Sequence, residues 1–311
     1  MNPQLELPRI RPGLPELRAP ADRPFNAIRS YLKDQSTLAE TIDRLASPID
    51  SYYDREFDDL VERSLHFTWQ TFNAIMVQIP HDNTAWHTRL AEILIGLSER
   101  PSPSDEVRMV TEPPGSILWA DLPYYSPDFV GGWLDAARVV YSELGLGGRL
   151  DPDFVPDHDL RREQWTRSNA FVARLVTKQC KALDYEVYAI HTMRAALEDE
   201  LHADELWINV PAAAVWVFHA GNFLFRSQRE WVFVPEKGNA EGRSVAYGGP
   251  LWQGKTGSCI ERWDFWKERF GVIVEREDVD EDTRSWADST KRKMEEIQLA
   301  PLYHSPSSTH C

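Results

Sequence analysis

The sequence predicts an all-α fold, a single helical domain of about ten helices joined by irregular Pro/Gly-rich connectors. Apolar residues recur with a helical period in every long segment, and no segment shows the alternation typical of a β-strand. The 16 glycines and 21 prolines gather between these segments rather than in hairpin turns. We therefore expect a flexible segment at 1–24, a helical domain at 25–300 with a possible internal boundary near 145–158, and a disordered tail at 301–311.

Capping residues and prolines define the first helices. A short helix near 25–33 is followed by one that opens at Thr37, where Thr37 and Glu40 form a capping box. The next helix is long and is expected to run from about 48 to 79. Pro80 ends it, because proline lacks the N–H that would continue the hydrogen-bond ladder.

The middle of the chain holds two further helices separated by a long connector. Asn83 is a good N-cap for a helix that ends before Pro101. Residues 101–127 are rich in proline and form either a lid or a surface loop. A helix at 127–144 then leads to the glycine-rich midpoint at 145–148.

Long helical segments also dominate the second half. The segment at 205–225 is nearly all apolar and is therefore expected at the centre of the fold. Residues 226–255 are expected to be irregular. The predicted helices lie at about 159–180, 184–202, 205–225, 258–270 and 280–298.

The composition predicts a cytoplasmic protein that buries a sizeable core without disulfides. The chain has 311 residues, of which 42% are hydrophobic. Its three cysteines, Cys180, Cys259 and Cys311, have no metal-like spacing, which favours free thiols in a reducing compartment. The amino-terminal segment has no apolar core of a signal peptide, and we expect no later stretch to reach the length of a membrane span.

The charge argues against a protein that coats nucleic acid, and the missing motifs argue against a metalloenzyme and a serine hydrolase. A formal net charge of -15 argues against DNA binding or coating of nucleic acid, so any contact with RNA must be local. The sequence contains no HExxH motif, no CxxC pair, no nucleophile elbow and no dinucleotide fingerprint. We therefore expect no metal and no cofactor.

Residues 249–256 have the spelling of a phosphate-binding P-loop, but the context does not fit. A P-loop follows a buried strand, which is missing here, and Pro250 and Trp252 suit its tight wrap poorly. What remains is a glycine-rich turn with Lys255 before the helix at Ser258, which could form a weak anion site. The alternative is a loop that packs Trp252.

Three carboxylates lie close together in Asp58-Asp59-Leu60-Val61-Glu62. On a helix, Glu62 lies one turn from both aspartates, so each like-charge pair costs about a few tenths of a kcal/mol, which a cation or a proton would relieve. The competing interpretation is a solvated face, because charged residues are mostly exposed. His66 is a possible acid–base partner one turn later. The same helix is expected to bury a different stripe, formed by Phe57, Val61, Leu65, Thr68, Phe72, Ile75, Met76 and Ile79.

Basic and aromatic residues supply the remaining candidates. Arg167, Arg174, Lys178 and Lys181 follow helical spacing and are expected to form one basic face, which is either a phosphate-contacting strip or a solvated surface. Trp263 and Trp266 lie one turn apart and are either part of a pocket or core anchors. The candidate substrate-binding residues are His66, Trp69, Trp119, Trp263 and Trp266.

Several short motifs stand out between Phe25 and Phe270. They are Tyr31-Leu32 with Ala39 and Leu45, Ile79-Pro80-His81-Asp82, Leu118-Trp119-Ala120-Asp121-Leu122-Pro123, Trp165 with Asn169-Ala170-Phe171-Val172-Ala173-Arg174-Leu175, Ala212 through Trp216 with Ala220-Gly221, and Gly249-Pro250-Leu251-Trp252 with Ser258 and Glu261-Arg262-Trp263-Asp264-Phe265-Trp266-Lys267. Through this set the chain resembles a large fungal family of unassigned function, catalogued as OpdG-like (domain of unknown function 3632).

The Asp-Asp-x-x-Glu motif at 58–62 resembles that of the fungal arginine-containing cyclodipeptide synthases. This resemblance implies a cofactor-free enzyme of secondary metabolism that joins arginine to a second amino acid, both taken from aminoacyl-tRNA, and closes a diketopiperazine. Asp58 and Asp59 would hold cationic groups of the substrate and Glu62 would be the base, although the sequence leaves these roles open. Arg167, Arg174, Lys178, Lys181 and Lys255 would contact tRNA. The alternative is a non-catalytic regulator or partner protein encoded in a fungal metabolite gene cluster.

Overall fold

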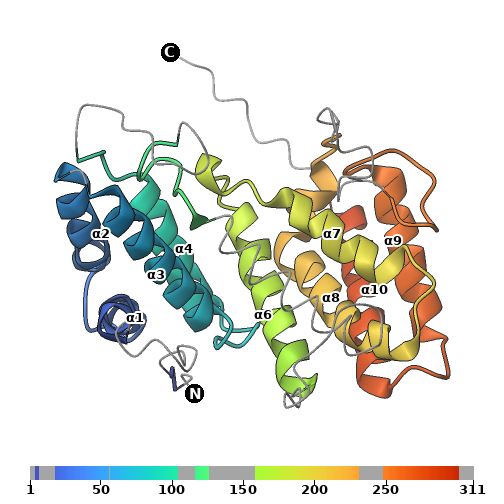
Figure 1. Ribbon diagram of the computed structural model, residues 1–311. Coiled ribbons are helices and arrows are strands. Elements are labelled where there is room, and N and C mark those ends of the chain that lie inside the picture. The colour runs from blue at the N-terminus through green and yellow to red at the C-terminus, as the bar shows by residue number, and fades with distance from the viewer. Residues whose placement is uncertain are drawn as a thin grey trace. The chain divides into compact units, whose positions relative to one another are not determined.

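The computed structural model describes residues 4–6, 18–55, 57–103, 116–125, 158–230 and 248–300. These residues form helices and no β-sheet, so the all-α prediction is confirmed (Figure 1). The predicted helix at 127–144, the glycine-rich midpoint and the carboxyl-terminal tail lie outside the described residues. The chain divides into two compact units, Met1–Tyr185 and Glu186–Cys311, so the division falls after the region near 145–158 where a boundary was expected.

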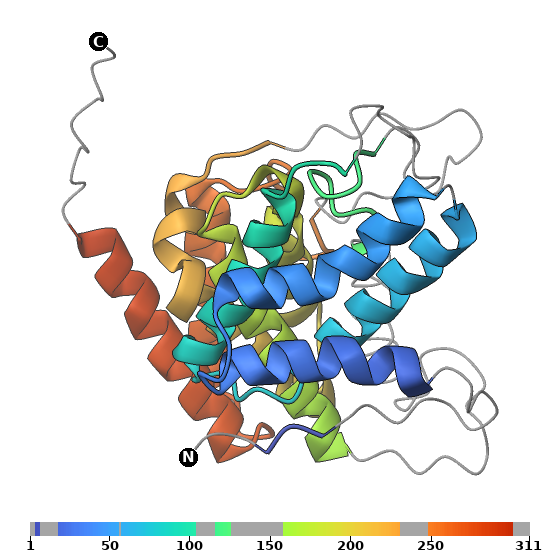
Figure 2. The ribbon, with the colours of Figure 1, turned by 90° about the vertical axis from the view of Figure 1, so that its left-hand side faces the viewer.

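Unit 1 is built from five described α-helices and one short 3-10 helix. Helix α1, seen end-on in Figure 1 and from the side in Figure 2, packs against α2, α3 and α4. Helix α6 packs against α3 and α4. Helix α1 begins within the segment that was predicted to be flexible. The elements are α1 (Arg18–Leu32), α2 (Leu38–Asp54), α3 (Asp58–Met76), α4 (Thr84–Ser98), α6 (His158–Val176) and η2 (Lys181–Leu183).

The single helix predicted from 48 to 79 is in fact two helices, α2 and α3. Arg55 ends α2, and the Phe57 N–H donates to the Tyr52 carbonyl at 3.1 Å before α3 begins at Asp58. The apolar period continues across the break, and periodicity alone therefore could not find it. The predicted stripe is buried from Val61 onward, whereas Phe57 is 49% exposed because it precedes the helix.

Side-chain caps fix the starts of three helices. Thr37 and Glu40 form the predicted capping box of α2, with the Thr37 hydroxyl accepting from the Glu40 N–H at 3.2 Å. Asn83 caps α4 by accepting from the Trp86 N–H at 3.1 Å. Asp280 caps α10 (Glu281–Leu299) in the same way. Each cap satisfies an N–H group that has no partner inside its own helix.

Unit 2 is built around α8, which packs against α7 and α10, while α9 packs against α7 and α10. Gly221 of α8 lies against α10, where an added Cβ would come 2.5 Å from Cδ1 of Ile297, so the glycine permits a close approach of the two helices. Unit 2 contains α7 (Glu186–Leu197), α8 (Ala203–Arg226), α9 (Ile260–Val274) and α10 (Glu281–Leu299).

Helix α8 corrects one expectation from the sequence. Among the described helices, it is long and apolar enough to cross a membrane by length and composition alone. However, 72% of its most apolar window is buried inside the protein. This burial is what a helix at the centre of a core shows, and it agrees with the central position predicted for 205–225.

The capping box of α2 makes a direct stability prediction. We expect Thr37→Ala to lower the free energy of unfolding by about 1 kcal/mol, because the Glu40 N–H would lose its acceptor. Ser47→Ala, an exposed substitution inside the same helix, is the control and should change it by less than about 0.5 kcal/mol. Chemical denaturation followed by circular dichroism measures both variants. Equal stability of the two variants would contradict the importance of the cap.

Candidate functional site

The candidate carboxylates lie at the start of α3 and not in the middle of a helix. Asp58 and Asp59 occupy its first turn and are exposed. The N-cap residue, Phe57, makes no side-chain cap hydrogen bond, so its side chain satisfies none of the first N–H groups of α3. Negative charge at a helix amino terminus is stabilising. The expected mutual repulsion of the acids is therefore offset by the helix itself.

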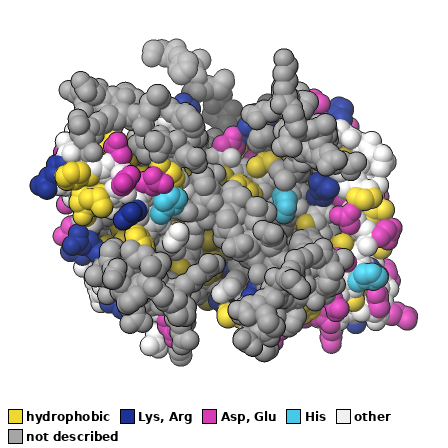
Figure 3. All heavy atoms as spheres, viewed as in Figure 1, with side chains coloured by type: hydrophobic (Ala, Val, Ile, Leu, Met, Phe, Trp, Pro, Cys, Tyr) yellow, Lys and Arg dark blue, Asp and Glu magenta, His cyan; other side chains and the backbone are white. Residues whose placement is uncertain are grey.

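His66 follows the acids along α3, and Tyr124 of the 116–125 segment packs against it. Nε2 of His66 lies 3.8 Å from Oε1 of Glu62, and the two side chains are 33% and 46% exposed. The ring of Tyr124 lies against His66 with 4.7 Å between the ring centroids. In the view of Figure 3, acidic side chains gather beside a histidine on the left, over the helices of unit 1. Carboxylates that are open to solvent thus adjoin an acid–base side chain.

Residues 116–125 bring Tyr124 to this position. The Trp69 indole N–H donates to the Pro123 carbonyl at 2.8 Å, and the ring of Tyr125 packs on Trp69 with centroids 5.3 Å apart. Leu122 and Tyr124 have φ angles of 47° and 63°. Such angles cost about 1–2 kcal/mol for residues with a Cβ, and they persist only where the surroundings impose them. The contacts of Trp69 supply that constraint.

The other end of this segment is held by an ion pair between α2 and the end of α4. The Trp119 indole N–H donates to Asp50 at 2.7 Å. The Arg100 guanidinium donates to the second oxygen of the same carboxylate from Nε at 3.0 Å and from Nη2 at 2.7 Å. Trp69 and Trp119 are both 0% exposed. As substrate-binding residues they stay predictions, and in this structure they act as buried anchors of the 116–125 segment.

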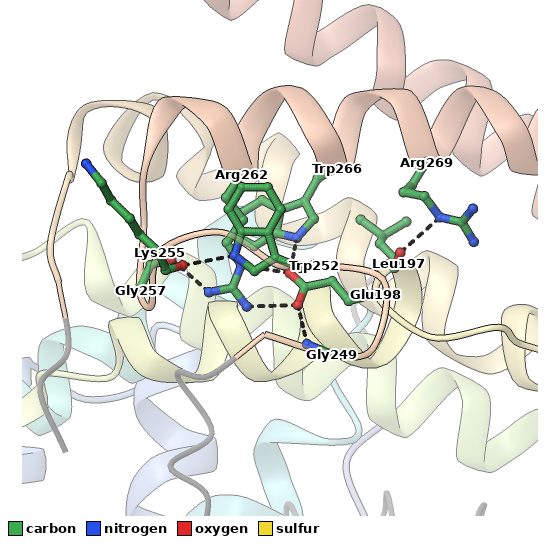
Figure 4. Close-up of polar contacts among 9 residues, drawn as sticks. All are labelled: Leu197, Glu198, Gly249, Trp252, Lys255, Gly257, Arg262, Trp266 and Arg269. Atoms are coloured by element: carbon green, nitrogen blue, oxygen red, sulfur yellow. Dashed lines mark hydrogen bonds and ion pairs between the residues drawn. The ribbon is translucent and has the colours of Figure 1, made fainter. Parts of the chain in front are cut away.

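Unit 2 contains a buried ion pair that joins α7 to α9 (Figure 4). Glu198 and Arg262 are both 0% exposed in their side chains. Arg262 donates to the two oxygens of Glu198 from Nε at 2.7 Å and from Nη2 at 2.9 Å. Trp266 adds its indole N–H at 2.6 Å to Oε1. These bonds satisfy a carboxylate that would otherwise be strongly disfavoured inside a core.

The same ion pair holds the glycine-rich turn that has the spelling of a P-loop. The Gly249 N–H donates to the Glu198 carboxylate at 2.8 Å, and Arg262 donates to the Gly257 carbonyl at 2.9 Å. A Cβ at Gly249 would lie 2.6 Å from the Glu198 carbonyl oxygen, so only glycine fits there. This turn therefore serves the packing of unit 2. Trp263 and Trp266 are each 2% exposed. Both therefore lie in the core, which is the alternative to a pocket that the sequence left open.

The predicted basic residues do not share one helical face. Helix α6 ends at Val176, so Lys178 and Lys181 lie beyond it. The Arg174 side chain is turned inward, with the residue only 8% exposed. The Arg167 side chain is 20% exposed, donates to the Val77 carbonyl at 3.2 Å and pairs with Glu163. The residues in exposed positions are Lys178, Lys181 and Lys255.

The structure also reveals residues that the sequence did not indicate. Asp50 lies in α2 with no neighbouring motif, and Glu198 follows the last turn of α7. Tyr124 reaches His66 only because of the backbone angles of its segment. The available signal was Arg262, a cation in a row of aromatic core residues that requires a buried anion. Among the described residues no group of three or more His, Cys, Asp or Glu side chains could hold a metal ion.

A comparison with family models gives one match. A model described as "Protein of unknown function (DUF3632)" matches residues 69–270. The matched range contains the 116–125 segment and the Glu198–Arg262 pair, and it begins after Asp58, Asp59 and Glu62. No curated protein and no solved structure matches the chain. The match concerns the family and carries no activity with it.

The buried ion pair predicts a non-additive loss of stability. We expect Arg262→Met to lower the free energy of unfolding by about 3–5 kcal/mol, because it leaves the Glu198 carboxylate buried without its cation. Glu198→Leu combined with Arg262→Met should cost less than the sum of the single changes, which a double-mutant cycle measures.

The control for this prediction is Arg292→Gln. Arg292 pairs with Asp288 on the surface and is 71% exposed, so its loss should change stability by less than about 0.5 kcal/mol. An Arg262→Met variant as stable as this control would show that the pair does not hold unit 2 together.

Proposed function

The chain belongs to the DUF3632 family of unknown function, and on that premise we propose that it synthesises an arginine-containing cyclic dipeptide from aminoacyl-tRNA in fungal secondary metabolism. The observation that carries the proposal is the open carboxylate group of Asp58, Asp59 and Glu62 beside His66. The resemblance of this Asp-Asp-x-x-Glu motif to that of the arginine-containing cyclodipeptide synthases supports it. We propose a cytoplasmic site of action, because charged tRNA is found there.

The exposed acids suit a cationic substrate. A guanidinium presents a planar fork of donors that binds carboxylates bidentately. Asp58 and Asp59 form no ion pair with any described residue, so their oxygens can accept these donors. The partial positive charge at the start of α3 opposes a cation, and binding therefore needs several carboxylates together. In this scheme the two aspartates hold the arginine side chain or its ammonium group.

The reaction needs positioning and a base rather than a source of energy. The amine of one aminoacyl group attacks the ester carbonyl of the other, one amide bond forms, and one tRNA leaves with its terminal hydroxyl restored. The α-amine of the transferred acyl group then attacks the ester that still joins the dipeptide to the second tRNA. This attack closes the ring and releases that tRNA. Each attack transfers a proton from nitrogen to the leaving oxygen. Glu62, 3.8 Å from His66, is the proposed base, and His66 is its partner in proton transfer.

Contacts with arginyl-tRNA and a second aminoacyl-tRNA would come from exposed cations. Lys178, Lys181 and Lys255 are exposed, whereas Arg167 and Arg174 are engaged within unit 1. We therefore assign the proposed phosphate contacts to the lysines. Because such contacts are electrostatic, they are expected to weaken with salt.

One observation favours a second candidate function, that of a non-catalytic partner protein. Phe57, which directly precedes the acids, and Leu60, which lies among them, are 49% and 39% exposed, as they would be on a docking surface for another protein. In a partner protein, Phe57, Leu60 and the acids would serve complex formation, and none of them would take part in chemistry. The carboxylate variants separate the two functions.

The central test replaces each acid by its amide. We expect Asp58→Asn, Asp59→Asn and Glu62→Gln each to reduce product formation by about 100-fold or more, as loss of a positioned acid–base group commonly does. The two aspartate variants should also lose about 0.3–1 kcal/mol of stability, because they lie in the first turn of α3. Product is measured by mass spectrometry from purified protein with arginine, a second amino acid, their synthetases and tRNA.

Glu99→Gln provides the matched control, since Glu99 is an exposed acid at the end of α4. It should retain full product formation. Absence of any cyclic arginine compound from the wild-type reaction, or full activity in all three carboxylate variants, would refute the proposed function.

A further inference from the structure

Arg174 of α6 is a buried cation with an unusual set of partners. The residue is 8% exposed. Its Nη1 donates to the Ala170 carbonyl at 3.0 Å and to Nδ1 of His87 at 2.9 Å, and its Nη2 lies 3.3 Å from the Thr84 hydroxyl. A guanidinium can only donate, so Nδ1 of His87 is the acceptor and the imidazole is neutral. All three partners are uncharged.

The unused edge of this guanidinium is the edge that binds carboxylates elsewhere in the molecule. Arg100 uses Nε and Nη2 to hold Asp50, and Arg262 uses the same two atoms to hold Glu198. In Arg174, Nε makes no hydrogen bond to any described residue, and Nη2 makes only the contact of 3.3 Å with Thr84. The fork that fits an oxyanion bidentately is therefore without one.

The charge of Arg174 is poorly compensated by its surroundings. Burial lowers the pKa of Arg174 to about 10, with Asp82 acting in the opposite direction. The side chain thus stays charged at neutral pH. Asp82 is exposed and forms no ion pair with Arg174. A buried charge without a counter-ion destabilises the fold, and an anion bound to it would offset that cost.

Other groups around the turn between α3 and α4 also favour an anion. Thr84, which contacts Arg174, is the first residue of α4, where the helix carries partial positive charge. His81 lies near enough to Arg174 and Arg167 for both to lower its pKa, after the larger effect of burial. The opposing negative charges are Asp82 and Glu163, of which Glu163 already pairs with Arg167.

We propose that Arg174 binds a small oxyanion, the phosphate or carboxylate group of a ligand, on its Nε and Nη2 edge at the turn between α3 and α4. This site is distinct from the carboxylate cluster of α3 and does not depend on the proposed synthase activity. It also accounts for the inward position of a residue that was expected to contact phosphates from the surface.

Titration of the full-length protein with inorganic phosphate and with acetate, against chloride at equal ionic strength, tests this proposal. Calorimetry should show saturable binding of at least one of the two anions, and that anion should raise the melting temperature. Binding of phosphate alone identifies a phosphate group as the ligand, and binding of acetate alone identifies a carboxylate. If neither anion binds more strongly than chloride, the proposal is wrong.

Substitutions locate the site. Arg174→Lys keeps the charge and removes the fork, so it should weaken binding by about tenfold or more. Asp82→Asn removes the opposing charge from an exposed position and should tighten binding about two- to tenfold. Arg292→Lys, the same charge-conserving change at an exposed position in unit 2, should leave binding unchanged.

The Asp82 variant keeps the proposal falsifiable if Arg174→Lys does not fold. Unchanged or weaker anion binding in Asp82→Asn would overturn the assignment to this turn. Equal loss of binding in Arg174→Lys and Arg292→Lys would show that the anion does not bind at the fork of Arg174.

Discussion

The described connectors of this helical protein have no sheet edge to pair with, and buried or half-buried polar side chains hold them in place. In unit 2 the Glu198–Arg262 pair fixes the glycine-rich turn to α7 and α9. In unit 1 the Asp50–Arg100 pair and the indole of Trp69 hold the 116–125 segment against α2 and α3. Each of the two carboxylates, the buried Glu198 and the half-buried Asp50, accepts from the connector and from an arginine at once, which offsets its desolvation.

This constraint also shapes the candidate site. Tyr124 reaches His66 through backbone angles that are unfavourable for a tyrosine, and the contacts of Trp69 with Pro123 and Tyr125 keep the segment in that form. The strain is thus stored next to the acids of α3. Strained backbone tends to be retained where a side chain must be held in one position. The anchoring of the segment and the arrangement of the site are therefore one structural feature.

The sequence predicted the helical class, the capping box at Thr37 and the Asn83 cap, because these depend on local period and local hydrogen bonding. It missed the break between α2 and α3, since the apolar stripe runs through it. It also misjudged Arg174, because a charged residue at helical spacing looks the same whether it faces solvent or a neighbouring helix. Partners distant in sequence, such as Glu198 for Arg262, depend on the tertiary fold, so Arg262 indicated a buried anion but not which residue supplies it.

Unit 1 contains two exposed acids at the start of α3 and one buried cation in α6. Asp58 and Asp59 form no ion pair with any described residue, and the buried Arg174 forms no hydrogen bond to a described carboxylate. Elsewhere in the described part of the chain, the half-buried Arg100 and the buried Arg262 each hold a carboxylate with both fork atoms. A fold that can form such pairs and leaves these charges apart keeps each of them available for a charged group from outside the protein. We propose that the exposed acids and the buried cation correspond to two separate recognition sites, one for a cation and one for an oxyanion.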